Sequence, residues 1–133
     1  MGADTQSAEP LRKLCFLVLH SGAGALSDCA TPILHALTAN AMECEVEMHF
    51  IGAGVRLLAA GVAEEVPAGL PPKPLAALLA DAHANGVRIH ACTSAWKAHA
   101  PTGAGLTAYS AGFAGAATYL GRALDPAWRV LSY

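Results

Sequence analysis

The sequence predicts a single-domain, three-layer α/β fold, in which helices cover both faces of a mainly parallel sheet of about five strands. Its first strand-like segment, residues 13–20, is a continuous apolar run, as expected for a parallel strand that is covered on both faces. Strand-like and helical segments then alternate along the chain, and right-handed crossovers between parallel strands place helices on both sides of a sheet. The length of 133 residues suits one domain with a sizeable core.

Residues 13–20 are the predicted central strand, and a long helix follows them. After a turn of small residues, apolar side chains recur at helical spacing up to about Ala41. Proline is tolerated in the first turn of a helix, so Pro32 places the start of this helix between Ser27 and Pro32.

Residues 44–51 alternate between apolar and polar side chains, which predicts a strand with one buried face. The other face carries Glu45, Glu47 and His49 and should meet water or a polar interface. Because a fully covered strand is apolar on both faces, we expect this strand to lie nearer the edge of the sheet than residues 13–20.

The chain after residue 51 is predicted to contain three helices and two strands. Pro74 is suited to the start of one helix, and Gly86 is suited to the left-handed conformation that ends it. The Pro-rich residues 62–73 read as an internal loop. The helices are expected at residues 52–61, 74–85 and 111–123, and the strands at residues 87–91 and 128–133.

The composition excludes several classes of protein. The net charge is −2 and the sequence has no run of Lys or Arg, so we expect no basic surface that would bind nucleic acid or an anionic membrane. No apolar run approaches the roughly 20 residues of a membrane helix, and the polar start lacks the features of a signal peptide, so we expect a cytoplasmic protein.

Residues 1–12 should form a flexible segment before one domain at residues 13–133. With 54% hydrophobic and 14% charged residues, the chain is rather apolar for the surface of a small monomer. Burial of apolar surface between subunits would account for this excess.

The chain has four cysteines, and their spacing predicts neither a metal site nor a disulfide framework. We expect free thiols, because an unexported chain lies among reducing thiols. Three of them are best explained as buried, structural residues. These are Cys15, Cys29 and Cys44.

Cys92 directly follows the predicted strand at residues 87–91, and open α/β sheets bind ligands at the carboxyl ends of their strands. Backbone N–H groups around Thr93 and Ser94 would favour the thiolate, which is the reactive form of cysteine. Lys97 or His99 would act in the same sense if either folds back. The alternative is that Cys92 packs as a small buried hydrophobe.

Three histidines are expected near the same edge of the sheet. His20 ends the first strand, His90 precedes Cys92 by two residues, and His99 follows in the next loop. Imidazole and thiolate are ligands for zinc or copper, so His90, Cys92 and His20 are weak candidates for a metal site. Without a paired motif, tuning of Cys92 by one histidine is the preferred interpretation, and no cofactor is expected.

A binding module of a different class is the alternative function. Gly22, Gly24 and Ser27 follow the first strand as half of a dinucleotide fingerprint would, and Glu45 or Glu47 lies at about the distance of a ribose-binding acid. Ser27 replaces the third glycine, however, and the acids lie within a strand. A small-ligand, nucleotide or metal-binding oligomeric module therefore remains the second hypothesis.

Three stretches carry a resemblance to a known family. They are residues 48–58 (MHFIGAGVRLL), residues 85–94 (NGVRIHACTS) and residues 123–133 (ALDPAWRVLSY). Together with the order of elements, they resemble the DsrE/DsrF-like family of sulfur-relay proteins, which includes TusD-like and YchN-like members. The resemblance begins near Leu14. The family cysteine is often followed by glycine, whereas Thr93 follows Cys92 here.

This resemblance implies a DsrE-like α/β fold and assembly as a homo-oligomer, either a trimer or a hexamer. It also implies that Cys92 accepts sulfane sulfur as a persulfide and relays it from a sulfur-donor protein to a sulfur-acceptor protein. We therefore expect a sulfur carrier or sulfurtransferase. That chemistry requires an exposed sulfur of low pKa, which is the property expected for Cys92 at the end of a strand.

Overall fold

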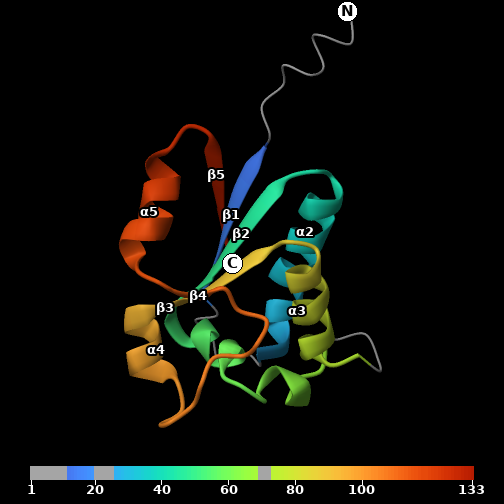
Figure 1. Cartoon of the computed structure of the whole chain (residues 1–133), viewed down its shortest axis with the longest axis vertical. Coiled ribbons are helices and arrows are strands. Elements are labelled where there is room, and N and C mark those ends of the chain that lie inside the picture. Colours follow the sequence, from blue (N-terminus) through green and yellow to red (C-terminus); the bar gives the residue numbers. More distant parts are fainter. Residues whose placement is uncertain (1–11, 20–25, 69–72) are drawn as a thin grey trace, which may run out of the picture.

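The computed structural model describes residues 12–19, 26–68 and 73–133, and it has the α/β fold that the sequence predicts (Figure 1). Five strands form one sheet in the order β4-β3-β2-β1-β5, and all four pairings are parallel. The strands are β1 (Lys13–Val18), β2 (Glu45–Phe50), β3 (Arg88–Cys92), β4 (Gly112–Ala114) and β5 (Trp128–Ser132).

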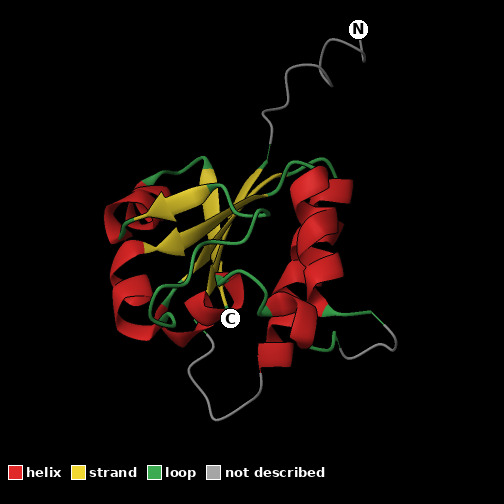
Figure 2. Ribbon diagram, turned by 60° about the horizontal axis from the view of Figure 1, so that its bottom comes forward, coloured by secondary structure: helices red, strands yellow, loops and turns green. Residues whose placement is uncertain are grey.

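Helices lie on both sides of this sheet, as Figure 2 shows most clearly. On one side, α2 (Ala30–Ala41) and α3 (Leu75–Ala84) pack against β1, β2 and β3. On the other side lie α4 (Thr93–His99) and α5 (Ala116–Leu124), with α4 at the end of the sheet where β3 finishes. In the described parts of the connections lie three short 3₁₀ helices: η1 (Leu26–Cys29), η2 (Gly52–Leu58) and η3 (Ala63–Glu65).

The main hydrophobic core lies between the sheet and the pair α2 and α3. Val46, Met48 and Phe50 point into it from β2 and are at most 1% exposed, because successive side chains of a strand alternate between its faces. Helix α2 starts at Ala30, inside the predicted interval, and places Pro32 in its first turn. The core therefore follows the hydrophobic pattern of the sequence.

The predicted order of the strands is wrong in one respect. β2 and not β1 lies at the centre of the sheet, and the polar face of β2 is covered: Glu47 is 1% exposed and His49 is fully buried. Arginine side chains from β3 and α5 bind the carboxylate of Glu47, so an acidic residue remains charged in a covered strand.

The predicted helix at residues 111–123 is wrong in its first part. β4 occupies residues 112–114, and α5 begins only at Ala116. Gly112 has φ +117°, which no helix contains, and Gly115 is the extended N-cap of α5. A strand of three residues, only one of them with a large side chain, carries too little pattern to be recognised in the sequence.

Some expectations lie outside the described residues. They concern His20, Gly22 and Gly24 and the predicted flexible segment up to Leu11. Among the helices that the structure describes, none combines the length and the apolar character needed to cross a lipid bilayer.

Candidate functional site

Cys92 is the last residue of β3 and also the N-cap of α4, so strand and helix join without a loop. Its backbone is extended, with φ −67° and ψ 126°, and Thr93 already begins the helix. The backbone N–H groups at the start of a helix have no partner within the helix, and here they point back toward the sulfur. The predicted strand at residues 87–91 is shifted by one residue, which places Cys92 inside the strand.

Among the described residues, the Ser94 hydroxyl forms a side-chain hydrogen bond with the sulfur of Cys92 and lies 3.5 Å from Sγ. Burial alone would raise the pKa of Cys92, which is 4% exposed, but the Ser94 hydroxyl, the backbone N–H groups of Ala95 and Ser94 at the start of α4 and the hydroxyl of Tyr119 outweigh burial and lower the pKa. The surroundings therefore favour the thiolate, as expected, but the expectation of an exposed sulfur is wrong, because Cys92 is buried where β3 meets α4.

Two stacked histidines lie beside Cys92 under α5. His49 of β2 is in register with His90 of β3, and their ring centroids are 4.9 Å apart. The ring of Tyr119 packs on His49 with a centroid distance of 5.6 Å. Burial lowers the pKa of both histidines, and the Nδ1 atoms of both are buried without a hydrogen-bond partner in the described structure. Both rings are therefore expected to be neutral near pH 7.

Glu47 is the centre of a buried ion-pair network on the same face. The carboxylate accepts two hydrogen bonds from Arg122 of α5 (3.0 and 3.1 Å), one from Arg88 of β3 (3.0 Å), and lies 2.7 Å from Nε2 of His49. Burial would raise the pKa of Glu47, but the hydrogen bonds from Arg122, His49 and Arg88 lower it to about 2. Arg122 thereby fastens α5 to the sheet.

Cys15, Glu47 and His49 place potential metal-ligand atoms within 4.8 Å of one another. The carboxylate, however, is already bound by two arginines, whose charges oppose a cation. Burial and the charge of Glu47 raise the pKa of Cys15 to about 11, so its thiol holds the proton. These contacts describe an ion-pair network better than a metal centre.

The structure brings only some of the predicted site residues to Cys92. Ser94 contacts the sulfur, and His90 lies on the same face of β3. Thr93 is exposed, and neither its side chain nor those of Lys97 and His99, both exposed in the last turn of α4, hydrogen-bonds the sulfur in the described structure.

Tyr119 and Arg122 are residues near this site that the sequence analysis missed, and it considered Glu47 only as a ribose-binding acid. A helix that packs across a sheet brings residues far apart in the chain together, and Arg122 and Glu47 are separated by 75 positions. The sequence did indicate the position of Arg88. Every second residue of a strand lies on the same face, so Arg88 and Cys92 of β3 share one face of the sheet.

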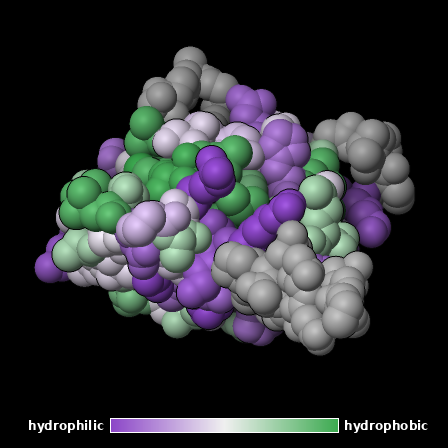
Figure 3. Space-filling model, turned by 90° about the horizontal axis from the view of Figure 1, so that it is seen from above, coloured by the Kyte–Doolittle hydropathy of each residue, from purple (hydrophilic) through white to green (hydrophobic). Residues whose placement is uncertain are grey.

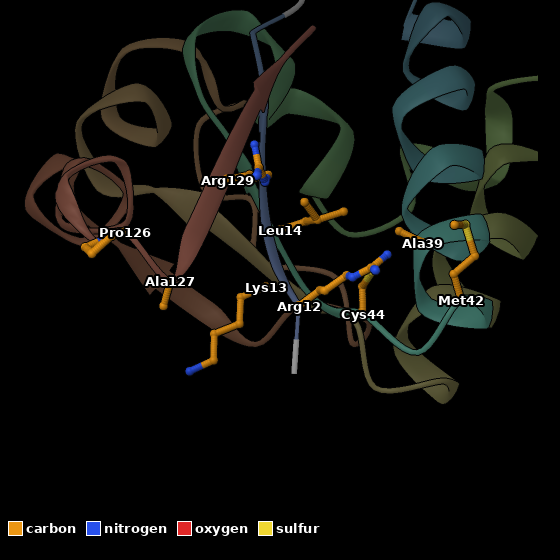
Figure 4. A pocket seen from close by; sticks show the side chains of 9 residues that line it. All are labelled: Arg12, Lys13, Leu14, Ala39, Met42, Cys44, Pro126, Ala127 and Arg129. Atoms are coloured by element: carbon orange, nitrogen blue, oxygen red, sulfur yellow. The ribbon is translucent and has the colours of Figure 1, made fainter. Parts of the chain in front are cut away.

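A pocket of about 650 Å³ lies at the opposite edge of the sheet, where the strands begin (Figure 4). Leu14, Ala39 and Met42 form an apolar wall between β1 and α2, with the guanidinium groups of Arg12 and Arg129 nearby. Figure 3, which views the molecule from this end, shows apolar surface bordered by polar side chains. Because Cys92 ends its strand at the other edge, the pocket is separate from the cysteine site.

Comparison with known proteins agrees with the fold. The structure of MTH1491 from Methanobacterium thermoautotrophicum, a protein of unknown function, is similar, with a TM-score of 0.63 and 14% identity over 92% of this chain and 99% of the other. A search of curated proteins found no match. The model of the DsrE/DsrF-like family matches residues 12–132, and the chain therefore belongs to this family.

Proposed function

We propose that this protein is a sulfur carrier, in which Cys92 accepts sulfane sulfur as a persulfide and relays it to the thiol of a partner protein. The observation that carries the proposal is the position of Cys92 where β3 meets the start of α4, with the Ser94 hydroxyl 3.5 Å from its sulfur, and these surroundings lower the pKa of Cys92. By contrast, the pKa values of Cys15 and Cys29 are raised to about 11. The family is associated with sulfur relay, which supports the same function.

The reaction consists of two thiol exchanges. In the first, the Cys92 thiolate attacks the outer sulfur of a donor persulfide, the donor S–S bond breaks, and the donor leaves as a thiolate. In the second, an acceptor thiolate attacks the outer sulfur of the Cys92 persulfide and becomes a persulfide itself, while Cys92 leaves as a thiolate with the electron pair. Each exchange is balanced and needs no oxidant or reductant.

Assembly as a homo-oligomer, a trimer or a hexamer, is part of the proposal. α5 is apolar on its outer side, where Leu120 is 54% and Leu124 85% exposed, and Phe113 of the neighbouring β4 is 51% exposed. Exposed apolar side chains of this size favour contact with another subunit. Light scattering should give the mass of a trimer or hexamer. A monomer at all concentrations would contradict this part of the proposal, and Leu124→Glu should weaken the assembly.

Loading followed by a chase tests the function. The protein is incubated with a small persulfide donor, digested, and mapped by mass spectrometry, and an acceptor thiol is then added. We expect one additional sulfur atom on the peptide that contains Cys92, and its loss after the chase. A peptide that gains no sulfur would contradict sulfur relay and leave a ligand-binding or assembly module as the function.

A further inference from the structure

The pocket at the beginning of the strands is built from parts of the chain that are distant in sequence: the start of β1, the end of α2 and the start of β5. Arg12, directly before β1, and Leu14 lie on the same face of the sheet, because successive side chains of a strand alternate between its faces. Arg129 of β5 is in register with Leu14 and shares this face. The sheet therefore presents two guanidinium groups beside an apolar side chain.

Helix α2 supplies the rest of the apolar wall. Ala39 lies in its last turn, and Met42 is its C-cap. Met42 is 65% exposed although its side chain is apolar, and an unbranched thioether can adapt its shape to an apolar partner. The volume of about 650 Å³ lies within the range of about 300–1,000 Å³ that small-molecule sites occupy. The pocket thus offers a small ligand both room and uncovered apolar surface.

The charge around this pocket is positive. Among the residues that the structure describes, no carboxylate forms an ion pair with Arg12 or Arg129. The acidic residues next to the lining residues in the chain are Glu43, Glu45 and Asp125, and none of them lines the pocket. In Figure 4 the Arg12 side chain extends from the start of β1 toward α2. The pocket therefore suits a ligand that carries a negative charge.

We propose that this pocket binds a small amphipathic carboxylate, whose charged group is held by Arg12 and Arg129 and whose apolar body packs on the apolar wall. A guanidinium group can donate two parallel N–H hydrogen bonds to one carboxylate, which matches this chemistry. The apolar wall supplies affinity for the body of the ligand, and the arginines select the sign of its charge. The inference does not depend on sulfur transfer, because the pocket and Cys92 lie at opposite edges of the sheet.

Titration with decanoate, followed by NMR of ¹³C-labelled methionine methyl groups, tests this site. The chain contains only 3 methionines, so the spectrum is simple, and Met42→Leu identifies the signal of Met42. We expect decanoate to shift that signal in a saturable way and to leave the signal of Met48, which is fully buried in the core, in place. Decyltrimethylammonium has the same apolar chain and the opposite charge, and inorganic phosphate has no apolar body. Both should bind at least about tenfold more weakly than decanoate.

Arg129→Gln should weaken decanoate binding about tenfold, as for loss of a hydrogen bond to a charged group, and should not change thermal unfolding, because Arg129 is exposed. The matched control is Arg56→Gln. Arg56 is an exposed arginine of η2 that donates to the carbonyl of Ala53 and does not line the pocket, so binding should equal that of the wild type. An unshifted Met42 signal at millimolar decanoate would contradict the proposal. Unchanged affinity in Arg129→Gln, or equally tight binding of decyltrimethylammonium or phosphate, would also contradict it.

Discussion

Replacement of Cys92 by serine should abolish the uptake of sulfane sulfur, from about one atom per chain to none. Serine is nearly the same size and retains a hydrogen-bonding group at the start of α4, so the fold should persist. Its hydroxyl cannot form a persulfide. Sulfane sulfur bound to the protein is released by cyanide as thiocyanate, whose colour with iron measures the amount.

The other three cysteines provide matched controls for this variant. Cys15 and Cys29 are at most 1% exposed, and burial, aided by the charges of Glu47 and Asp28 respectively, raises the pKa of each to about 11. Alanine at either position, or at the buried Cys44, should leave uptake unchanged. Sulfane sulfur that persists in Cys92→Ser would place the carrier at another cysteine and contradict the proposed site.

Replacement of Glu47 by glutamine should have the largest effect on stability, a loss of about 3 kcal/mol in the free energy of unfolding at pH 7. The carboxylate is 1% exposed and accepts hydrogen bonds from two arginines. An amide removes the charge and turns an N–H₂ group toward these donors. This loss is at the lower end of the range for a broken buried ion pair. The reason is that the side chains of Arg88 and Arg122 are 45% and 33% exposed, so water can hydrate their charges when the carboxylate is removed. Urea unfolding measures the change.

Glu45→Gln is the control for this variant. Glu45 lies on the same face of β2 and binds the same Arg88 at 2.8 Å, but its side chain is 28% exposed. Partly exposed ion pairs contribute at most about 1 kcal/mol. Equal losses in the two variants would mean that burial of Glu47 does not set its contribution, and would contradict the role assigned to the network.

The contribution of Glu47 should also depend on pH in a defined window. The pKa of Glu47 is about 2 in the folded protein, against an ordinary value of 4.5. A lowered folded pKa stabilises the protein above the unfolded pKa, and this stability is lost as pH falls from about 4.5 toward about 2. The stabilities of wild-type protein and Glu47→Gln should therefore converge within this window, whereas parallel curves would contradict the low pKa.

Most of the fold could be predicted from the sequence because its strands carry strong patterns. The apolar run of β1 and the alternation in β2 each specify a strand on local grounds. The prediction of burial was wrong where a side chain is covered by residues that are distant in the chain. Glu45, Glu47 and His49 indicate an exposed face in isolation, but α5 and its Arg122 cover that face in the folded protein.

The candidate site could be predicted only in part, for a related reason. Cys92 could be predicted as a candidate because it follows a strand, and the carboxyl end of a parallel strand is set by the order of local elements. The position of Tyr119 depends on how α5 is rotated about its axis and where it crosses the sheet. Those features follow from the Glu47–Arg122 contact and leave no local pattern near Tyr119.

The rate of alkylation of Cys92 against pH is the most direct test of the central claim, that the fold holds this cysteine as a reactive thiolate. The rate is followed on the Cys92 peptide, so that the buried thiols do not contribute. We expect an apparent pKa below the ordinary value for cysteine, which is about 8.5. A pKa at or above that value, or no reaction in the folded protein, would mean that Cys92 is a buried structural cysteine and would contradict the account.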